Sequence, residues 1–527
     1  MAAATNEAGD GPDVSVIVAV HNTMPYLRQC LKSLVRQTIG RDRLEVIAVD
    51  DGSTDGSGRE LDRFALRYPS TFTVIHQTNS GGPAAPSNRA LRKATGHYVF
   101  FLGADDHLGP EALERLVDAA DRHGSDVVAG RMVGLNGRFV PQAIFERTDY
   151  DVDLYNSPLP FAISNTKLFR RSVITDNDIW FPENQPFGSD QPFTVAACIH
   201  AKKISVLADY DYYFAVRRTT GLNITYRATH LERLRCTELI MRDSTARLLP
   251  PGPKRDAVMY RSFASELSKL TRADFLNLDS DTQRQVAEGI GRLVDTYLTH
   301  AISARLDAGR RARLMLAHAG RLDDLVGAVR QNADLEPLPL VADDGRLYAA
   351  YHGFRDARQP LPDDWFLVTD SAVEAVARRL DVTAIQWPRE RGRGRMLAVI
   401  AHSPLDLATV TAANLHIVVG DTRQAVTLRA APAGGTTVEA RLPLRAVVAH
   451  QPRWGIGRDV RLEAGTTAVP LRLPRALANR WRPARAGRRL YVLRSGRQAD
   501  GEMALDVIPV TLTRVARPVW ERVFGRR

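Results

Sequence analysis

The first part of the chain alternates apolar runs of strand length with segments whose apolar residues recur at helical spacing. The run Val14–Val20 (VSVIVAV) predicts a buried strand. The segment after it predicts a helix, because one helical face collects Leu27, Cys30, Leu31, Leu34 and Val35. Further strands are predicted at 45–50, 72–76, 98–102 and 126–129, and further helices at 57–68, within 81–96 and at 110–123. This alternation predicts an α/β fold with parallel strands and helices on both faces of the sheet.

The pattern changes twice in the remainder of the chain. From Thr229 to about Val329 it is helical and amphipathic, and beyond Asp381 short alternating segments separated by Gly, Pro and Asp are typical of an antiparallel β-sandwich. We therefore predict a disordered lead at 1–12, an α/β domain at 13–225, a helical segment at 226–330, a linker at 331–380, a β-sandwich at 381–515 and a basic tail at 516–527.

Composition indicates a cellular compartment and argues against membrane-spanning, secreted and disulfide-rich proteins. The chain contains no run of about 18 apolar residues, which argues against a membrane-spanning helix. Its first residues lack the basic and apolar segments of a signal peptide. The three cysteines, Cys30, Cys198 and Cys236, are far apart in sequence and odd in number, which argues against a disulfide framework. We therefore expect a cytoplasmic protein.

Charge is distributed unevenly along the chain. Residues 381–527 contain 25 Arg, no Lys and 11 Asp or Glu, a net charge of +14, whereas the whole chain carries +11. This asymmetry indicates a polyanionic partner, although a merely solvated Arg-rich surface explains it equally well. Aromatic residues do not alternate with these arginines as they do in nucleic-acid platforms, so no nucleic acid is expected. The ending PVWERVFGRR favours a solvated helix end, with peripheral contact at the inner face of the cell membrane as the alternative.

Polar residues lie just beyond the carboxyl ends of the predicted strands. They are Asn22, Asp51, Asn79 and the adjacent pair Asp105 and Asp106. In open α/β sheets these strand ends meet in one crevice where ligands bind. The two adjacent carboxylates should repel each other, and a bound cation or nucleotide would relieve that repulsion.

Each of these positions also has a purely structural explanation. Asp105 and Asp106 could cap the turn before Pro110, and Asp51 could belong to a turn with a helix cap. Asn79 could bind phosphate at a helix start or simply sit in a tight turn. A carboxylate at Asp51 could instead accept the imide N–H of a pyrimidine. Three such groups at successive strand ends favour a nucleotide site.

The same stretches resemble a known family. SVIVAVHN, VDDGSTD, NSGGP and GADD resemble the family 2 glycosyltransferases, which share the nucleotide-sugar-binding GT-A fold. A closer resemblance, to the wall teichoic acid enzymes of Gram-positive bacteria that attach N-acetylglucosamine to poly(ribitol phosphate), is carried by GLNGRFVPQAIF, SNTKLFRRSVITDNDIWFPE, SDQPFTVAA and ISVLADYDYYFAVRR. The match covers roughly residues 13–220. Beyond it the relatives are similar only in architecture, with a helical segment and immunoglobulin-like β-domains that form trimers, so a homotrimer is implied here.

The resemblance also implies a role for individual residues. These roles are uracil stacking by His21, imide binding by Asp51, base contact by Asn79, ribose binding by Asp105, metal binding by Asp106 (Mn²⁺ or Mg²⁺), catalytic base by Asp190 and diphosphate contact by Arg218. Departures from the family pattern include Gly103, which replaces the first acid of an Asp-x-Asp-Asp motif.

Asp190 has two competing interpretations. It follows a turn-rich stretch and precedes a helical one, so it could be an N-cap. A general base must lie within about 2.6–3.2 Å of the acceptor hydroxyl, away from the metal, and a carboxylate here could do so. With the resemblance, catalysis is favoured, and the reaction becomes a single displacement with inversion at the anomeric carbon.

Three functions follow from these observations. The first is an inverting, metal-dependent glycosyltransferase that moves a sugar, with N-acetylglucosamine favoured, from a UDP-sugar to an anionic polyol-phosphate polymer of the teichoic acid type. The second keeps this chemistry and changes the acceptor to a capsule, exopolysaccharide or lipid-linked glycan. The third is a non-catalytic glycan-binding scaffold, suggested by the missing acid at Gly103.

Overall fold

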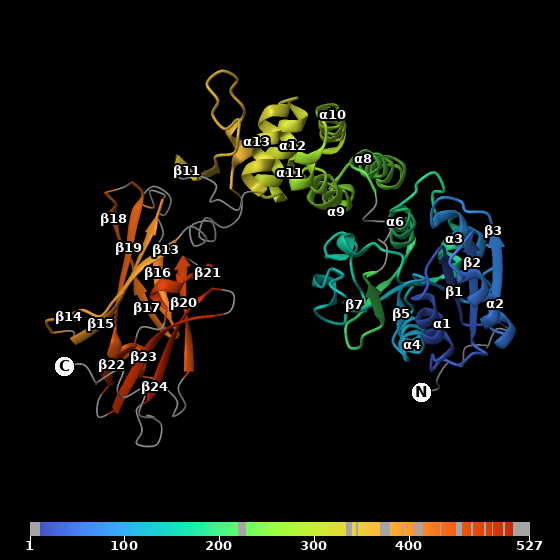
Figure 1. Ribbon diagram of the computed structural model, residues 1–527, viewed down its shortest axis with the longest axis horizontal. Helices are drawn as coiled ribbons and strands as arrows, with labels where there is room; N and C mark the ends of the chain where they lie inside the picture. Colours follow the sequence, from blue (N-terminus) through green and yellow to red (C-terminus); the bar gives the residue numbers. More distant parts are fainter. Residues whose placement is uncertain are drawn as a thin grey trace. The chain divides into compact units, whose positions relative to one another are not determined.

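The chain forms two compact units, Met1–Ile302 and Ser303–Arg527. The computed structural model (Figure 1) describes residues 11–219, 228–333, 340–343, 346–368, 380–392, 394–404, 407, 415–432, 434–449, 456–464, 467–478, 481–486, 489–498 and 501–509. Ten of the twelve residues predicted as a disordered lead, and the whole predicted basic tail, therefore lie outside the described residues. In the described part of the chain, no helix combines the length and apolar character needed to cross a bilayer.

The strands predicted in the first unit are confirmed. They are β1 (Val14–Val20), β2 (Leu44–Asp51), β3 (Phe72–Gln77), β4 (Tyr98–Phe101) and β6 (Val127–Gly130). They belong to one sheet with the strand order β3-β2-β1-β4-β8-β6-β9. β1 to β4 are mutually parallel where they pair, so their carboxyl ends lie at the same edge.

One strand of this sheet runs against the expected parallel direction. β8 (Leu168–Arg170) is antiparallel to both β4 and β6, whereas β9 (Ile204–Leu207) is parallel to β6. The strands that the sequence predicted all run in the same direction, and β8, where no strand was predicted, is the antiparallel addition. No crossover helix delivers this short strand in the parallel sense: it follows the irregular segment after β7 (Met132–Leu135).

Helices cover both faces of the sheet, as predicted. α1 (Leu27–Val35), α2 (Ser57–Arg67) and α4 (Ala112–His123) contribute to the core on one face. α3 (Ala84–Leu91) and α6 (Asp190–His200) contribute to the core on the other. Shorter elements of this region are a three-stranded sheet β5-β10-β7, with β5 at His107–Leu108 and β10 at Tyr213–Val216, and η1 (Ala143–Phe145), η2 (Leu159–Ala162) and α5 (Arg171–Asp176).

The predicted helical segment is helical, and the boundary between the two units falls inside it. The first unit contains α8 (His230–Leu239), η3 (Ile240–Ala246), α9 (Pro253–Arg261), η4 (Ser262–Leu267), η5 (Ala273–Asn277) and α10 (Ser280–Tyr297), and η3 and η4 are π-helical turns. α11 (His300–Arg305) spans the boundary, and α12 (Ala308–His318) and α13 (Leu322–Ala333) follow.

The range 331–380, predicted to be a linker, contains ordered elements. They are the hairpin β11 (Leu340–Asp343) and β12 (Arg346–Ala349) and the turn η6 (Asp363–Phe366). Phe366 is fully buried, and Arg311 of α12 donates to the carbonyl oxygens of residues 365 and 367 on either side of it. The apolar residues of this range are too few to show a strand or helix period in the sequence. Contacts with distant residues such as Arg311 order the range instead.

The C-terminal β-region consists of two antiparallel sheets around one core, as the prediction of a sandwich requires. One sheet contains β13 (Asp381–Gln386), β14 (Arg389–Glu390), β15 (Gly394–Ser403), β18 (Thr427–Ala430) and β19 (Thr436–Pro443). The other contains β16 (Leu415–Val419), β17 (Thr422–Ala425), β20 (Ile456–Ala464), β21 (Thr467–Pro470), β22 (Trp481–Ala486), β23 (Arg489–Arg497) and β24 (Met503–Pro509). The helices α16 (Leu444–Ala449) and η7 (Arg475–Leu477) complete it. The segment AVTLRA, predicted as one strand, is divided between β17 and β18 in different sheets.

Candidate active site

Three of the predicted donor-binding residues meet at the carboxyl edge of the sheet. His21 follows β1, Asp51 ends β2 and Asn79 follows β3. The Asn79 amide nitrogen lies 3.2 Å from His21 Nε2, and His21 Nδ1 lies 2.8 Å from the backbone oxygen of Asp51. Parallel pairing of β1, β2 and β3 therefore brings together residues that are up to 58 positions apart in sequence.

The Asp51 carboxylate is buried and is held by the loop after β3. Its Oδ1 accepts a hydrogen bond of 2.6 Å from Gln77 Nε2, and its Oδ2 accepts one of 2.9 Å from Ser80 Oγ. The backbone N–H of Ser80 also donates to both oxygens at 3.1 Å. The carboxylate thus orders the loop that carries Asn79, and imide binding by Asp51 stays a prediction.

A glycine makes the close approach of these two loops possible. Gly52 has φ of +71°, and a Cβ atom at this position would lie 2.8 Å from the backbone nitrogen of Asn79. Any side chain would be strained by the backbone conformation and would also push the loop of Asn79 away.

Asp105 and Arg218 form an ion pair beside this cluster. Arg218 Nε lies 2.7 Å from Asp105 Oδ2, and its Nη1 donates to the backbone oxygen of Asn22 at 3.2 Å. Both side chains are largely buried, with 17% and 16% of their surface exposed. Arg218, just after β10, therefore connects the loops that follow β4 and β1.

Asp106 is buried and accepts hydrogen bonds on both carboxylate oxygens. The Tyr213 hydroxyl donates to Oδ2 at 2.5 Å, and the backbone N–H of Val216 donates to Oδ1 at 2.7 Å. Burial, followed by the negative charge of Asp105, raises the pKa of Asp106 to about 7, although both hydrogen bonds act in the opposite direction. The two carboxylates are therefore in electrostatic conflict, as the sequence predicted.

Asp106 and Asp190 line one cavity of about 450 Å³, hereafter the reaction cavity. Asp106 enters it from the end of β4, and Asp190 enters it from the first turn of α6. Asp51 is not one of its lining residues; its carboxylate faces Gln77 and Ser80. The structure therefore joins the predicted metal ligand and the predicted base in one space, with the His21 and Asn79 cluster at the neighbouring strand ends.

Asp190 is not the N-cap of α6. The helix begins at Asp190 itself, and the N-cap position is Ser189, whose side chain makes no capping hydrogen bond. Burial raises the pKa of Asp190, while the positive charges of Arg261 and Lys167 oppose this shift. A carboxylate with a raised pKa that faces a cavity suits a general base.

Sequence comparison places these residues in a known family. A model of glycosyl transferase family 2 matches residues 15–177, and a model of the glycosyl transferase TarS linker domain matches residues 241–328. The poly(ribitol-phosphate) beta-N-acetylglucosaminyltransferase TarP of Staphylococcus aureus is 30% identical over 327 residues, which cover 57% of this chain and 96% of TarP. The chain belongs to the family 2 glycosyltransferases.

Two further proteins extend the comparison. The poly(ribitol-phosphate) beta-glucosyltransferase of Bacillus spizizenii is 42% identical over 205 residues, 39% of this chain and 32% of that enzyme. The chain thus spans about a third of the length of that relative. The crystal structure of S. aureus TarS 1–349 in complex with UDP-GlcNAc superposes with a TM-score of 0.56 and 29% identity, covering 64% of this chain and 97% of the TarS fragment.

Four residues of this family 2 member surround the two carboxylates, and the sequence analysis missed all of them. Tyr213 holds Asp106, and Arg138 lines the reaction cavity with a buried Nη1 that has no hydrogen-bond partner. Lys167 is buried and donates to the carbonyl oxygens of residues 162 and 164, both in the cavity wall. Arg261 donates to Gln191 at 2.7 Å. Tyr213 and Lys167 lie in stretches that carry the resemblance, whereas nothing local marks Arg261, which folds back from the helical segment.

The missing acid at Gly103 has a steric explanation in this glycosyltransferase chain. A Cβ atom at Gly103 would lie 2.6 Å from Asp106 Oδ2 and 3.1 Å from the Tyr213 hydroxyl. The position leaves no room for an aspartate, because Asp106 and Tyr213 occupy the space that its side chain would need.

The donor atoms present fit a divalent cation bound jointly with a diphosphate. Within the described ranges, no group of three or more His, Cys, Asp and Glu side chains could enclose a metal alone. Mg²⁺ commonly binds through one or two carboxylates and completes its shell with phosphate and water oxygens. Asp106 lines the reaction cavity and offers such an oxygen ligand.

Proposed function

We propose that this protein transfers N-acetylglucosamine from UDP-GlcNAc to a hydroxyl of a polyol-phosphate polymer, with inversion at the anomeric carbon. The observation that carries the proposal is the single cavity shared by Asp106 and Asp190, beside the cluster of His21 and Asn79. Support for the donor and the acceptor comes from the relatives: TarP is named for this transfer, and TarS 1–349 binds UDP-GlcNAc.

The residues of the site divide the tasks of the proposed reaction among them. His21 and Asn79 hold the base, Asp51 holds the loop of Asn79 and binds the imide, and Asp105 binds the ribose. The acceptor oxygen bonds to the anomeric carbon as the bond from that carbon to the diphosphate breaks, and UDP leaves with the bonding electrons. An Asp190 carboxylate oxygen takes the proton of the acceptor hydroxyl.

Cations balance the charge that develops on UDP. Arg218 and Arg138 lie close to Asp105 and Asp106 and would contact the diphosphate. Asp106 would hold Mn²⁺ or Mg²⁺ together with diphosphate oxygens, and the cation would stabilise the leaving group.

Glucose is the second candidate for the transferred sugar. The B. spizizenii relative, which shares 42% identity, is named as a glucosyltransferase. UDP release with UDP-GlcNAc and with UDP-glucose, in the presence and absence of oligo(ribitol phosphate), separates the two donors. The proposal would be overturned if the acceptor increased UDP release with neither UDP-GlcNAc nor UDP-glucose.

Replacement of the base tests the assignment of Asp190. We expect Asp190→Asn to lower kcat about 10²–10⁴-fold, because the general base is lost, with UDP affinity by calorimetry unchanged. Asp118→Asn is the matched control, because Asp118 is 53% exposed on α4, outside the reaction cavity. Transfer by Asp190→Asn at near wild-type rate would remove Asp190 from the mechanism.

A further inference from the structure

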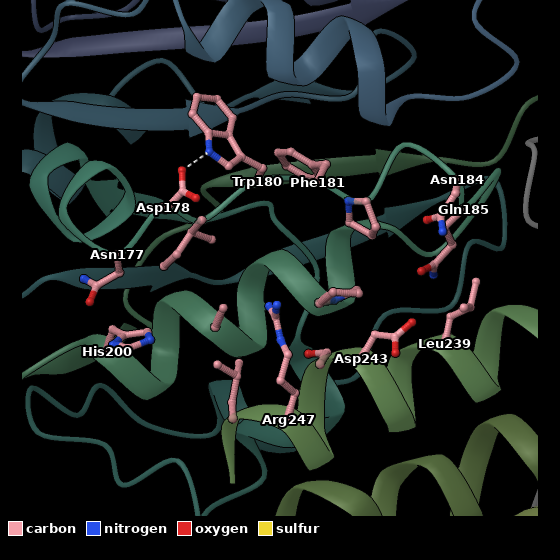
Figure 2. Close-up of a pocket in the computed structure, with 16 residues that line it drawn as sticks. Asn177, Asp178, Trp180, Phe181, Asn184, Gln185, His200, Leu239, Asp243 and Arg247 are labelled. Carbon is pink, nitrogen blue, oxygen red and sulfur yellow. Dashed lines mark hydrogen bonds between the residues drawn. The ribbon is translucent and has the colours of Figure 1, made fainter.

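A second cavity, of about 370 Å³, lies along α6 and is hereafter the α6 cavity. Figure 2 shows α6 passing between the segment that carries Asn177, Asp178 and Trp180 and the helix that carries Asp243 and Arg247. None of the residues assigned above to the donor or to catalysis lines this cavity. It therefore needs an explanation of its own.

Two residues that line the α6 cavity each carry a buried polar atom without a hydrogen-bond partner. These atoms are Gln185 Oε1 and Ser244 Oγ, in side chains of residues that are 1% and 3% exposed. Gln185 is held in place, because its Nε2 donates to the backbone oxygen of Phe187 at 3.0 Å. Folded proteins leave few such atoms unsatisfied, so these two need a polar partner that the protein itself does not supply. Ser244 lies in the π-helical turn η3, a feature that often marks functional sites.

Two cationic or potentially cationic side chains line the same cavity. Arg247 and His200 are exposed, and neither side chain forms a hydrogen bond or ion pair within the part of the chain that the structure describes. Figure 2 shows the Arg247 side chain extending from its helix toward α6. The nearby Asp243 carboxylate is already paired with Arg242, at 2.6 and 2.8 Å. The cavity therefore combines an available guanidinium with amide and hydroxyl groups.

We propose that the α6 cavity binds a phosphodiester-linked polyol segment of the acceptor polymer, remote from the hydroxyl that reacts. This inference rests on the proposed function and adds a second acceptor subsite to it. Arg247 and His200 would bind a phosphate group, and Gln185, Ser244 and Asn177 would bind polyol hydroxyls. A polymer that alternates phosphate groups and polyol hydroxyls accounts for both kinds of side chain.

The two cavities are neighbours along α6, so one extended polymer could contact both. Phe181 lines each of them, and Gln185 lies five residues before Asp190. His200, at the other end of α6, is ten residues after Asp190, or about 15 Å along the helix axis. An acceptor of one repeat unit would fill only the reaction cavity, whereas a longer acceptor would also reach the α6 cavity.

The test compares acceptors of one and eight ribitol-phosphate units, with binding measured by isothermal titration calorimetry without donor. We expect Arg247→Gln to weaken binding of the eight-unit acceptor about tenfold, because a charge-assisted hydrogen bond is lost. Ser244→Ala should weaken it about two- to tenfold by loss of a neutral hydrogen bond. Arg235→Gln is the matched control and should stay within about twofold, because Arg235 is an exposed arginine of α8 that does not line the cavity. Turnover of the one-unit acceptor should be unchanged in all three variants.

Each other outcome points to a definite failure. Equal losses in Arg247→Gln and Arg235→Gln, or no loss in Arg247→Gln, would overturn the α6 subsite while transfer by the wild type still supported the proposed function. A wild type that neither binds nor glycosylates the eight-unit acceptor would overturn the proposed acceptor class and the subsite with it. Binding that depends on Arg247 without any transfer would keep the subsite and overturn the proposed reaction.

Discussion

Gly103 provides the sharpest test of the arrangement around Asp106. The family pattern has an acid at this position, so Gly103→Asp would restore the motif. The structure predicts that this change would instead disturb the site. The first atom of any side chain at Gly103 would lie 2.6 Å from Asp106 Oδ2 and 3.1 Å from the Tyr213 hydroxyl.

The size of the expected stability loss depends on how firmly Asp106 Oδ2 is held. Asp106 is buried, and the Tyr213 hydroxyl and the Val216 N–H fix its two oxygens, so the carboxylate cannot rotate away without losing hydrogen bonds. Overpacking at such a site typically costs about 1–3 kcal/mol. At about 2–4 °C per kcal/mol for a domain of roughly 200 residues, Gly103→Ala should lower the unfolding temperature by about 2–12 °C. Gly103→Asp should lower it further, because it adds a third carboxylate beside Asp105 and Asp106.

Differential scanning calorimetry of the full chain measures this shift, in the transition that UDP displaces to higher temperature. Gly11→Ala is the control, since a Cβ atom at Gly11 meets nothing within 4 Å. An unfolding temperature of Gly103→Ala within 1 °C of the wild type would show that Asp106 is not held where the structure places it. Tighter UDP binding by Gly103→Asp in Mn²⁺ would refute the steric explanation for the missing acid.

Two further predictions concern groups beside the reaction cavity. Burial lowers the pKa of Lys167 to about 8 from its ordinary 10.5, so the unfolded chain holds this proton more tightly. The free energy of unfolding should therefore rise by up to about 3 kcal/mol as pH increases from about 8 to 10.5. Urea unfolding of Lys167→Met should lack that rise. The same pH profile in the variant and the wild type would contradict a lowered pKa of Lys167. Tyr213→Phe should lower the free energy of unfolding by about 2 kcal/mol at pH 8, because the hydrogen bond to the buried Asp106 carboxylate is lost and no cavity is created. Calorimetry measures this loss, with Tyr150→Phe as the control because Tyr150 is 41% exposed. Equal stability of the two variants would exclude that bond.

Local pattern was sufficient for the elements that the site is built on. The strand β1 was predicted correctly from a continuous, largely apolar run of seven residues, and α1 from apolar residues that recur at the helical period. The polar residues after β1, β2, β3 and β4 could be placed together for a similar reason, since parallel strands bring their carboxyl ends to one edge.

Pattern was insufficient where pairing or packing between distant segments decides the outcome. The antiparallel β8 spans three residues, too short for any period to indicate its direction. Within AVTLRA, the end of β17 at Ala425 and the start of β18 at Thr427 depend on which partner strand each of them pairs with. The ordered elements within 331–380 depend on contacts such as those of Arg311 with residues 365 and 367.

The sequence by itself determined the α/β order, the β-rich end and the row of carboxylates and amides at the strand ends, because these depend on local period and on motifs. Only the tertiary structure decided the state of those groups. It pairs Asp105 with Arg218, and it places the Tyr213 hydroxyl where it donates a hydrogen bond to Asp106. It also brings Arg261 and Lys167 near Asp190 from distant parts of the chain. Charge and burial act through space, so the pKa of a carboxylate and the shape of a cavity depend on neighbours that sequence separation does not reveal.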